Sequence, residues 1–258
     1  MFCLRGPKRC LCGLKGREGD MVRCLVKLGV LAILSLGIAT AASAESAKHL
    51  FERVLVIGAS VSADAYAPSP GKLVAKQAQV PPESFVLRAK SGKKSEYHLK
   101  WIQNNLENVH PSIIFGLDLF EHDVKKSWFL DAKTKARVRE IVERFCRTAN
   151  QVYIGNTIPY GFYFAPAMLN RYLLDLQKEF PNLHIVCIDC IYSGLYGGGY
   201  DYNINGVHLK VTKKQVLKDD VHPNLFGSTL MANVLIQQIR QINPEIDDKD
   251  LPYLPVKQ

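Results

Sequence analysis

Several features that would assign a chain quickly to a class are missing from this sequence. No internal repeat, low-complexity segment or linker divides its 258 residues, which favours one domain of ordinary size. The seven histidines lack the spacing of zinc ligands, and the glycines at 197–199 are not followed by the Lys-Ser/Thr pair of a phosphate-binding loop. The sequence therefore predicts a globular domain that needs no metal and no organic cofactor.

An excess of positive charge is present, but much of it lies at one end. The formal net charge is +9. Residues 1–44 hold seven Lys or Arg and two Asp or Glu, which leaves 26 basic and 22 acidic residues in the remainder. The basic residues of this remainder are not interpreted as clusters that pair with aromatic stacking residues. The sequence therefore predicts no nucleic-acid partner.

Residues 21–44 have the form of a secretory signal peptide. Arg23 and Lys27 make a short basic region, residues 28–39 are apolar, and residues 42–44 read Ala-Ser-Ala, a small-x-small cleavage pattern. The apolar run is too short for a comfortable membrane span, although a retained anchor is the alternative. No cysteine stands at the cleavage point, so a lipoprotein anchor is not indicated.

These features set the predicted domain boundaries. We expect residues 1–44 to be a leader, with Met21 as the true start, and residues 45–258 to form the mature domain. We therefore expect export to the periplasm or the exterior, with no stable membrane span after cleavage.

Three cysteines remain outside the leader, namely Cys146, Cys187 and Cys190. Because three is odd, at least one of them is free or pairs between chains. Cys187 and Cys190 have redox or metal spacing, but they follow an apolar run and have no second such pair nearby. We interpret them as buried strand cysteines, with a local disulfide as the alternative.

Short apolar runs alternate with segments of helical periodicity. The expected strands are residues 54–58, 84–88, 112–116, 151–155 and 183–188, and helical spacing recurs within 138–149, 169–180 and 230–239. Strands separated by helices imply parallel pairing through crossovers. The sequence predicts an α/β three-layer sandwich with a central parallel sheet of about five strands. Residues 191–221, rich in Gly, Tyr and Asn, are expected to form a long loop with some local pairing.

Two polar segments stand where such a sheet places its ligand site, beyond the carboxyl ends of its strands. Gly58 permits a sharp turn after the first strand, so Ser60 would project from the sheet edge as a nucleophile. A helix N-cap is the alternative for this serine.

Asp219 precedes His222 by three residues, a spacing that lets a carboxylate orient an imidazole toward a serine. A helix-capping segment is the alternative here.

These residues resemble the conserved blocks of the SGNH hydrolases, also called GDSL esterases. The first block, Gly-Asp-Ser-Leu in the family, corresponds to residues 58–61, and the last, Asp-x-x-His-Pro, corresponds to residues 219–223. A glycine after the second strand, whose N–H helps to bind the oxyanion, corresponds to Gly92. The resemblance spans about residues 53–242 and implies the flavodoxin-like fold of that family.

The chain departs from the family at two places. Ala59 replaces the aspartate beside the serine, and Asp118 replaces the asparagine whose side chain donates to the oxyanion. A carboxylate has no proton to donate unless it is protonated. Asn156, after the fourth strand, is a possible substitute donor. His122 and the neighbouring Asp123 either line the cleft or have ordinary surface and capping roles.

The resemblance implies an exported serine esterase that hydrolyses a carboxylic ester of a small molecule, a glycan or a lipid. In this interpretation Ser60 attacks, His222 is the general base, Asp219 orients it, and the N–H groups of Ser60 and Gly92 hold the oxyanion. The alternative is a catalytically weak glycan-binding protein of the cell envelope with the same fold. The presence of Asp118 in place of the asparagine donor is the reason for this alternative.

Overall fold

The structure is a computed structural model that describes residues 47–159 and 161–256, all of which belong to one compact unit. The predicted leader, its cleavage point and Met21 lie outside the described residues. Within the described ranges, no helix combines the length and the apolar character needed to cross a bilayer.

A five-stranded parallel sheet with the order β2-β1-β3-β4-β5 forms the centre of the fold, as the sequence predicted. Every residue of β1 and β3 is buried, because helices cover both faces of the sheet, and this is why these strands read as continuous apolar runs. The edge strands β2 and β5 are only partly buried. The strands are β1 (Val54–Gly58), β2 (Phe85–Ala89), β3 (Ile113–Gly116), β4 (Gln151–Gly155) and β5 (Leu183–Val186).

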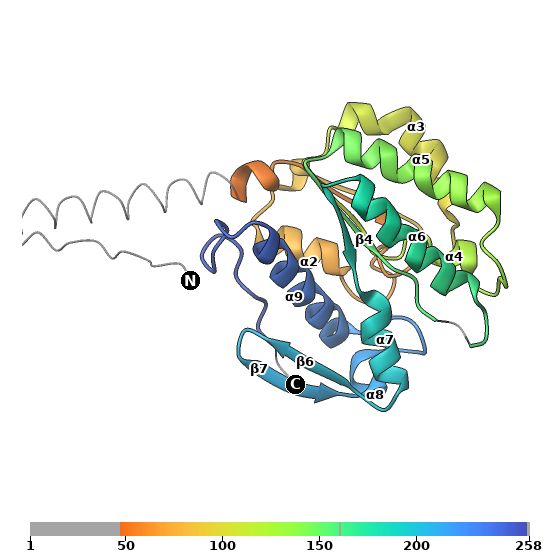
Figure 1. Ribbon diagram of the computed structural model, residues 1–258. Coiled ribbons are helices and arrows are strands. Elements are labelled where there is room, and N and C mark those ends of the chain that lie inside the picture. Colours follow the sequence, from red (N-terminus) through yellow and green to blue (C-terminus); the bar gives the residue numbers. More distant parts are fainter. Residues whose placement is uncertain (1–46, 160, 257–258) are drawn as a thin grey trace, which may run out of the picture. The chain divides into compact units, whose positions relative to one another are not determined.

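Helices cover both faces of this sheet (Figure 1). On one face lie α3 (Ser95–Val109), α5 (Ala132–Thr148) and α6 (Ala165–Glu179), with the short α4 (Glu121–Val124) beside them. On the other lie α2 (Pro70–Gln77), α7 (Ile188–Tyr196) and α9 (Leu225–Ile242). The three-layer α/β sandwich expected from the sequence is therefore confirmed.

The segment expected to be a long loop holds more regular structure than predicted. It contains most of α7, an antiparallel pair of β6 (Tyr200–Ile204) and β7 (Val207–Val211), and α8 (Lys213–Val216). The local pairing is confirmed, but the loop interpretation is wrong for most of the segment. Tyr202 and Ile204 alternate with exposed residues and are buried against the α9 face, which stabilises the hairpin.

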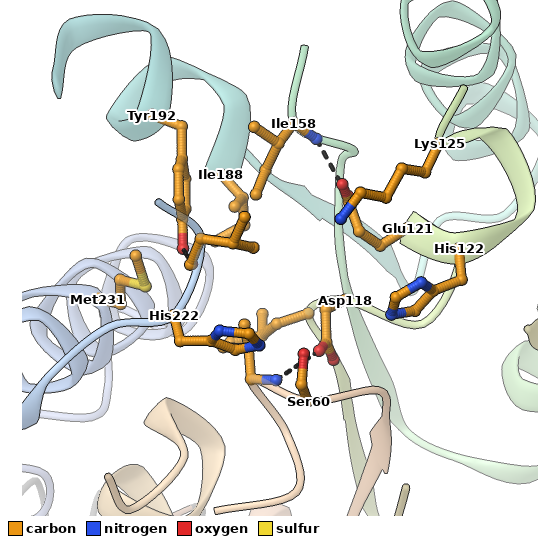
Figure 2. A pocket seen from close by; sticks show the side chains of 13 residues that line it. Ser60, Asp118, Glu121, His122, Lys125, Ile158, Ile188, Tyr192, His222 and Met231 are labelled. Atoms are coloured by element: carbon orange, nitrogen blue, oxygen red, sulfur yellow. Dashed lines mark hydrogen bonds between the residues drawn. The ribbon is translucent and has the colours of Figure 1, made fainter. Parts of the chain in front are cut away.

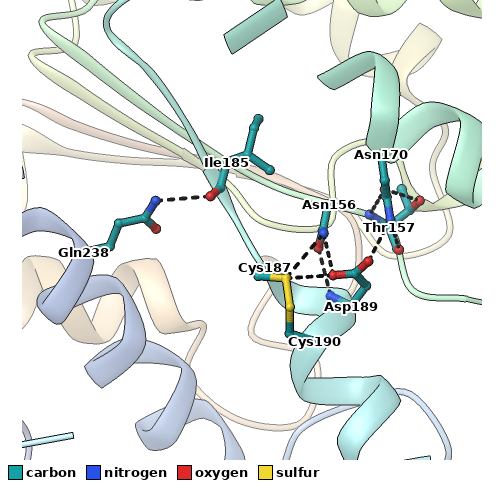
Figure 3. Close-up of a disulfide and its surroundings, with 8 residues drawn as sticks. All are labelled: Asn156, Thr157, Asn170, Ile185, Cys187, Asp189, Cys190 and Gln238. Carbon is teal, nitrogen blue, oxygen red and sulfur yellow. Dashed lines mark hydrogen bonds between the residues drawn. A yellow bond between two sulfur atoms is a disulfide. The ribbon is translucent and has the colours of Figure 1, made fainter. Parts of the chain in front are cut away.

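The fifth strand ends earlier than expected, and this changes the interpretation of its cysteines. The strand stops at Val186 and α7 begins at Ile188, so Cys187 and Cys190 stand at the start of a helix. Both are exposed, and a disulfide joins them (Figure 3). The buried-strand interpretation is wrong and the alternative, a local disulfide, is correct. Cys146 is the free cysteine of the described chain.

Candidate active site

The turn after β1 is held tightly against β3. A Cβ atom on Gly58 would lie 2.3 Å from Asp118 Oδ1, so no larger residue fits here. Ser60 follows two residues later and lies outside any helix, while the N-cap of α2 is Ser69. The N-cap alternative for Ser60 is therefore excluded.

Asp118 is the residue that holds this turn. Its carboxylate accepts hydrogen bonds from the N–H groups of Ala59 at 2.9 Å and Val61 at 2.7 Å, and from the Ser62 hydroxyl at 2.6 Å. Asp118 is buried. An acceptor of three hydrogen bonds has a positioning role, so the structure offers no support for Asp118 as an oxyanion donor. The Ser60 N–H, between the two bonded groups, keeps its hydrogen available, since no partner for it occurs in the described chain.

Asp219 and His222 contact each other directly. His222 Nδ1 lies 2.8 Å from Asp219 Oδ2, while Asp219 Oδ1 accepts the N–H groups of Val221 and His222, each at 2.8 Å. Desolvation raises the pKa of Asp219, but these hydrogen bonds outweigh it and lower the pKa to about 2. The carboxylate therefore stays ionised and fixes the imidazole tautomer, which leaves Nε2 free to accept a proton.

The helix that follows this segment does not use Asp219 as its cap. Asn224 is the N-cap of α9, and its side chain accepts the Gly227 N–H at 2.9 Å. The capping alternative for Asp219 is therefore excluded.

Aromatic side chains that the sequence interpretation missed fix the histidine segment. Tyr192 donates a hydrogen bond to the Val221 carbonyl, and Tyr196 donates one to the Asp220 carbonyl at 2.5 Å. The ring of Tyr66 lies against the His222 imidazole, with 4.5 Å between centroids. These tyrosines come from segments with no catalytic motif, so their role became visible only in three dimensions.

Ser60 and His222 line one small cavity at the carboxyl end of the sheet (Figure 2). Its volume is about 60 Å³. Since about 10–15 Å³ on this measure holds one water molecule, the cavity has room for a group of only a few heavy atoms. Its apolar walls come from the loops after β3 and β4 and from the helices α7 and α9. They include Leu117, Ile158, Ile188, Tyr192 and Met231.

The other wall of the cavity is polar and comes from α4 and the residue after it. Glu121, His122 and Lys125 line it, and Figure 2 shows Ser60 and Asp118 between the imidazoles of His222 and His122. Burial, and then the charge of Lys125, lower the pKa of His122 below its ordinary value. At neutral pH His122 is therefore a neutral donor or acceptor. Of the two alternatives for His122, the structure supports the place in the cleft.

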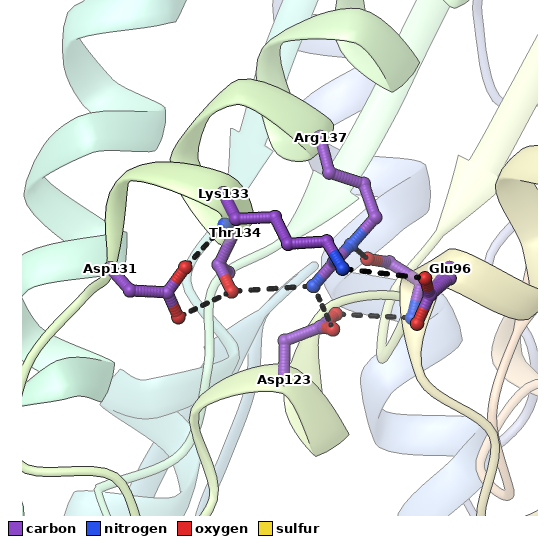
Figure 4. A network of polar contacts seen from close by, with 7 residues as sticks. Glu96, Asp123, Asp131, Lys133, Thr134 and Arg137 are labelled. Atoms are coloured by element: carbon purple, nitrogen blue, oxygen red, sulfur yellow. Dashed lines mark hydrogen bonds and ion pairs between the residues drawn. The ribbon is translucent and has the colours of Figure 1, made fainter.

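Asp123 is not among the residues that line the cavity, and it anchors α4 instead (Figure 4). Its Oδ1 accepts a bond from Arg137 Nη2 at 2.8 Å, and its Oδ2 accepts the N–H of Ser95 at 3.1 Å. Arg137 Nε also donates to Ser95 Oγ at 2.8 Å. This network fixes α4 to the first residue of α3 and to α5, so His122 is presented from a well-supported element.

Two further residues from the sequence interpretation lie outside the cavity. Gly92 is exposed, with a φ of +71°, and lines a separate groove beside α3. The amide of Asn156 donates to Asp189 Oδ1 at 2.5 Å and accepts the Asp189 N–H at 2.8 Å (Figure 3). Because these bonds engage both ends of its amide in fixing the start of α7, Asn156 does not serve as the substitute oxyanion donor.

One group of possible metal ligands occurs among the described residues. The ligand atoms of Cys187, Asp189 and Cys190 lie within 4.8 Å of one another. The two sulfur atoms are bonded to each other, so neither offers the thiolate that a metal ion would need.

Comparisons with known proteins bear on the fold. No family model and no curated protein matches the chain. Among solved structures, the acetylxylan esterase Axe2 from Geobacillus stearothermophilus matches with a TM-score of 0.54 and 14% identity, over 72% of this chain and 93% of that chain. The psychrotrophic esterase EstA from Pseudoalteromonas sp. matches with a TM-score of 0.54 and 14% identity, over 74% and 99%.

These similarities define the class of fold. Its parallel sheet flanked by helices matches those of SGNH-type esterases, so the chain has the SGNH hydrolase fold. Structures of catalytic mutants of Axe2 match as well, in which a serine, an aspartate or a histidine is replaced by alanine. That aspartate and histidine are three positions apart in Axe2.

Proposed function

We propose that this protein is a serine esterase that hydrolyses esters of short acyl groups. The observation that carries the proposal is the meeting of Ser60 and the Asp219–His222 pair at one cavity, from segments about 160 residues apart in the chain. The spacing of this aspartate and histidine equals that of the residues mutated in Axe2. Similarity of fold to esterases supports the same reaction class.

The proposed reaction follows acyl-transfer chemistry. Ser60 Oγ attacks the ester carbonyl while His222 Nε2 takes its proton, and His222 then passes that proton to the departing alcohol. Water attacks the acyl-Ser60 intermediate in the same manner and releases the carboxylic acid. Asp219 stays ionised throughout and stabilises the imidazolium that forms.

The developing oxyanion needs hydrogen-bond donors within the cavity. The Ser60 N–H is one, because Asp118 engages its two neighbours and leaves it unbonded. We propose His122 as the second donor, since its imidazole lines the same cavity and its lowered pKa keeps it neutral at pH 7. Gly92 remains a prediction for this role, which would require its loop to move toward the cavity.

The size of the cavity supports a short acyl group. A volume of about 60 Å³ suits an acetyl group and excludes a long fatty acyl chain without rearrangement. The lipid substrates that the sequence left open are therefore less favoured than acetylated molecules. The glycan-binding alternative loses its main argument, because Asp118 is bonded to the turn and is not an unpaired charge aimed at the substrate.

A direct experiment tests the esterase proposal. Hydrolysis of p-nitrophenyl acetate should be measurable, a fluorophosphonate probe should label Ser60, and both should disappear in Ser60→Ala. Ser62→Ala is a matched control that should still be labelled. Absence of hydrolysis and labelling in the folded protein, or labelling that persists in Ser60→Ala, would overturn the proposal.

Export is a separate proposal, supported by the order of basic, apolar and small residues in 21–44. The Cys187–Cys190 disulfide fits an oxidising compartment such as the periplasm. N-terminal sequencing of protein from the native cell should give a mature end at Glu45. An intact Met1 in a cytoplasmic fraction would contradict it.

A further inference from the structure

A second hollow lies along the first three turns of α3, from Glu96 to Asn105. Its walls come from Arg88 at the end of β2, from the following loop with Gly92, and from the face of α3 that carries Tyr97 and Trp101. Its volume is about 610 Å³, against about 60 Å³ for the cavity at Ser60. The groove is therefore large enough for several units of a polymer, whereas the cavity takes only a small group.

Positive charge is concentrated along this groove. Residues 88–101 contain five cations, at positions 88, 90, 93, 94 and 100, and a single carboxylate, Glu96. Their excess of four equals that of all residues after 44, which have 26 basic and 22 acidic side chains. Among the described residues, no ion pair joins these five cations to a carboxylate, and Glu96 lies nearest to Lys133, at 3.9 Å. The groove thus offers unpaired positive charge to a ligand.

The local helix geometry adds to this potential. Lys94 is the N-cap of α3 and makes no side-chain capping bond, and Lys93 precedes it. Cations are unfavourable at a helix N-terminus, where the backbone dipole is positive. In addition, Arg88 Nε is buried without a hydrogen-bond partner. An anion in the groove would offset the cations at the N-terminus of α3 and could accept a hydrogen bond from Arg88 Nε. Without an anion, neither feature stabilises the folded protein.

The aromatic rings beneath the cations decide between two kinds of polyanion. Arg88 Cζ lies 5.1 Å from the Tyr97 ring centroid and 5.7 Å from that of Trp101. Lys90 and Lys93 lie 5.8 and 5.6 Å from the Tyr97 centroid. Single-stranded nucleic acids need free ring faces on which bases stack. Here cations lie over the rings, and Arg88 Nη2 donates to the Tyr97 hydroxyl at 3.1 Å, so the arrangement suits carboxylates and hydroxyls better than bases.

The groove is joined to the candidate active site through two contacts. The Lys90 N–H donates to the Gly58 carbonyl at 2.9 Å, so the loop that begins the groove leaves the same sheet edge as the turn that carries Ser60. The N–H of Ser95, the first residue of α3, donates to Asp123, which follows His122 in the chain. A polymer held in the groove would therefore pass close to the cavity.

We propose that the groove binds an acidic polysaccharide, a chain of sugars that bear carboxylate groups, and presents its acyl esters to Ser60. This inference rests on the proposed esterase function and specifies its substrate class. Arg88, Lys93 and Lys94 pair with the carboxylates, and the amides of Asn104 and Asn105, which also line the groove, contact sugar hydroxyls. The acyl group alone enters the small cavity.

Binding is measured separately from turnover, in the Ser60→Ala background, by calorimetry with polygalacturonate as the acidic probe and xylan as the neutral probe. We expect polygalacturonate to bind in 20 mM salt and to weaken as salt rises. Substitution of Lys93→Gln together with Lys94→Gln should weaken binding by about tenfold, because two charge-assisted contacts are lost. The pair Lys210→Gln and Lys214→Gln removes the same charge from β7 and α8 and should change binding by less than about twofold.

The possible results separate this inference from the proposed function. Equal binding of xylan and polygalacturonate, or binding that the Lys93 and Lys94 substitutions leave unchanged, would overturn it. Tighter binding of single-stranded DNA than of polygalacturonate would replace the glycan with a nucleic acid. If wild-type protein fails to hydrolyse p-nitrophenyl acetate but binds polygalacturonate through these lysines, the groove stands and the esterase proposal fails.

Discussion

The carboxylate of Asp118 accepts a hydrogen bond from the hydroxyl of Ser62 at 2.6 Å, and so ties β3 to the turn that carries Ser60. In the resembled family an asparagine stands at this position and an aspartate stands beside the serine. Here the serine's neighbour is Ala59, and the carboxylate comes instead from Asp118, in the turn after β3. The turn keeps an acidic acceptor, but the side-chain donor to the oxyanion is lost.

The substitution Asp118→Asn should therefore destabilise the protein. An amide presents one oxygen and one NH₂ group, so at least one of the three donors around position 118 would face another donor. We expect the free energy of unfolding to fall by about 1–3 kcal/mol and turnover on p-nitrophenyl acetate to fall as well. Urea denaturation and a steady-state assay measure the two effects.

The exposed Asp201 provides the control for this substitution, since Asp201→Asn should change neither quantity. Faster turnover in Asp118→Asn with unchanged stability would contradict the assignment, because it would mean that the carboxylate repels the oxyanion.

His122 should contribute directly to the rate. If its imidazole donates to the oxyanion, His122→Ala should lower kcat by about 100- to 1,000-fold and leave KM within a few-fold, since the bond forms mainly in the transition state. The exposed His208→Gln is the control and should behave as wild type. A loss of less than twofold in His122→Ala would remove His122 from the reaction.

The Cys187–Cys190 disulfide should stabilise the protein modestly. The loop that it closes has a sequence separation of 3, and loop-closure entropy for so short a loop amounts to about 2 kcal/mol. We expect dithiothreitol to lower the midpoint of urea denaturation slightly, and the double variant Cys187→Ser, Cys190→Ser to respond to it no further. Intact mass that shows two free thiols at these positions in untreated protein would contradict the bridge.

The sequence predicted the sheet well because its central strands are buried on both faces and its helices repeat with clear spacing. It also identified Ser60, Asp219 and His222 as candidates, because local motifs carry them; the structure places Ser60 and His222 at one cavity with Asp219 bonded to His222, and their catalytic roles stay predictions. It failed where the role of a side chain depends on partners distant in the chain, as for Asn156 with Asp189 or Tyr192 with Val221. The basic groove was missed for a different reason, because the net charge of all residues after 44 hides the five cations and two large aromatic rings that lie close together within residues 88–101.

His98 gives the protein a specific sensitivity to acid. Its side chain is fully buried in α3, and neither ring nitrogen has a hydrogen-bond partner. Burial, and then the charge of Arg88, lower the pKa of His98 to about 4. In the unfolded chain the imidazole has its ordinary pKa of about 6.5, so between these two values only the unfolded state binds the proton.

The free energy of unfolding should therefore be highest above pH 6.5 and should fall as the pH drops toward 4, by about 2 kcal/mol at pH 5 from this group alone. His98→Leu removes the titrating group at similar volume and leaves no unpaired ring nitrogen, so it should flatten this dependence between pH 7 and pH 5. Urea denaturation of both proteins at several pH values in that range gives the comparison. The exposed His208→Leu should keep the wild-type slope, because its imidazole is solvated in both states. If His98→Leu also keeps that slope, His98 is protonated in the folded protein and its burial does not set the acid limit.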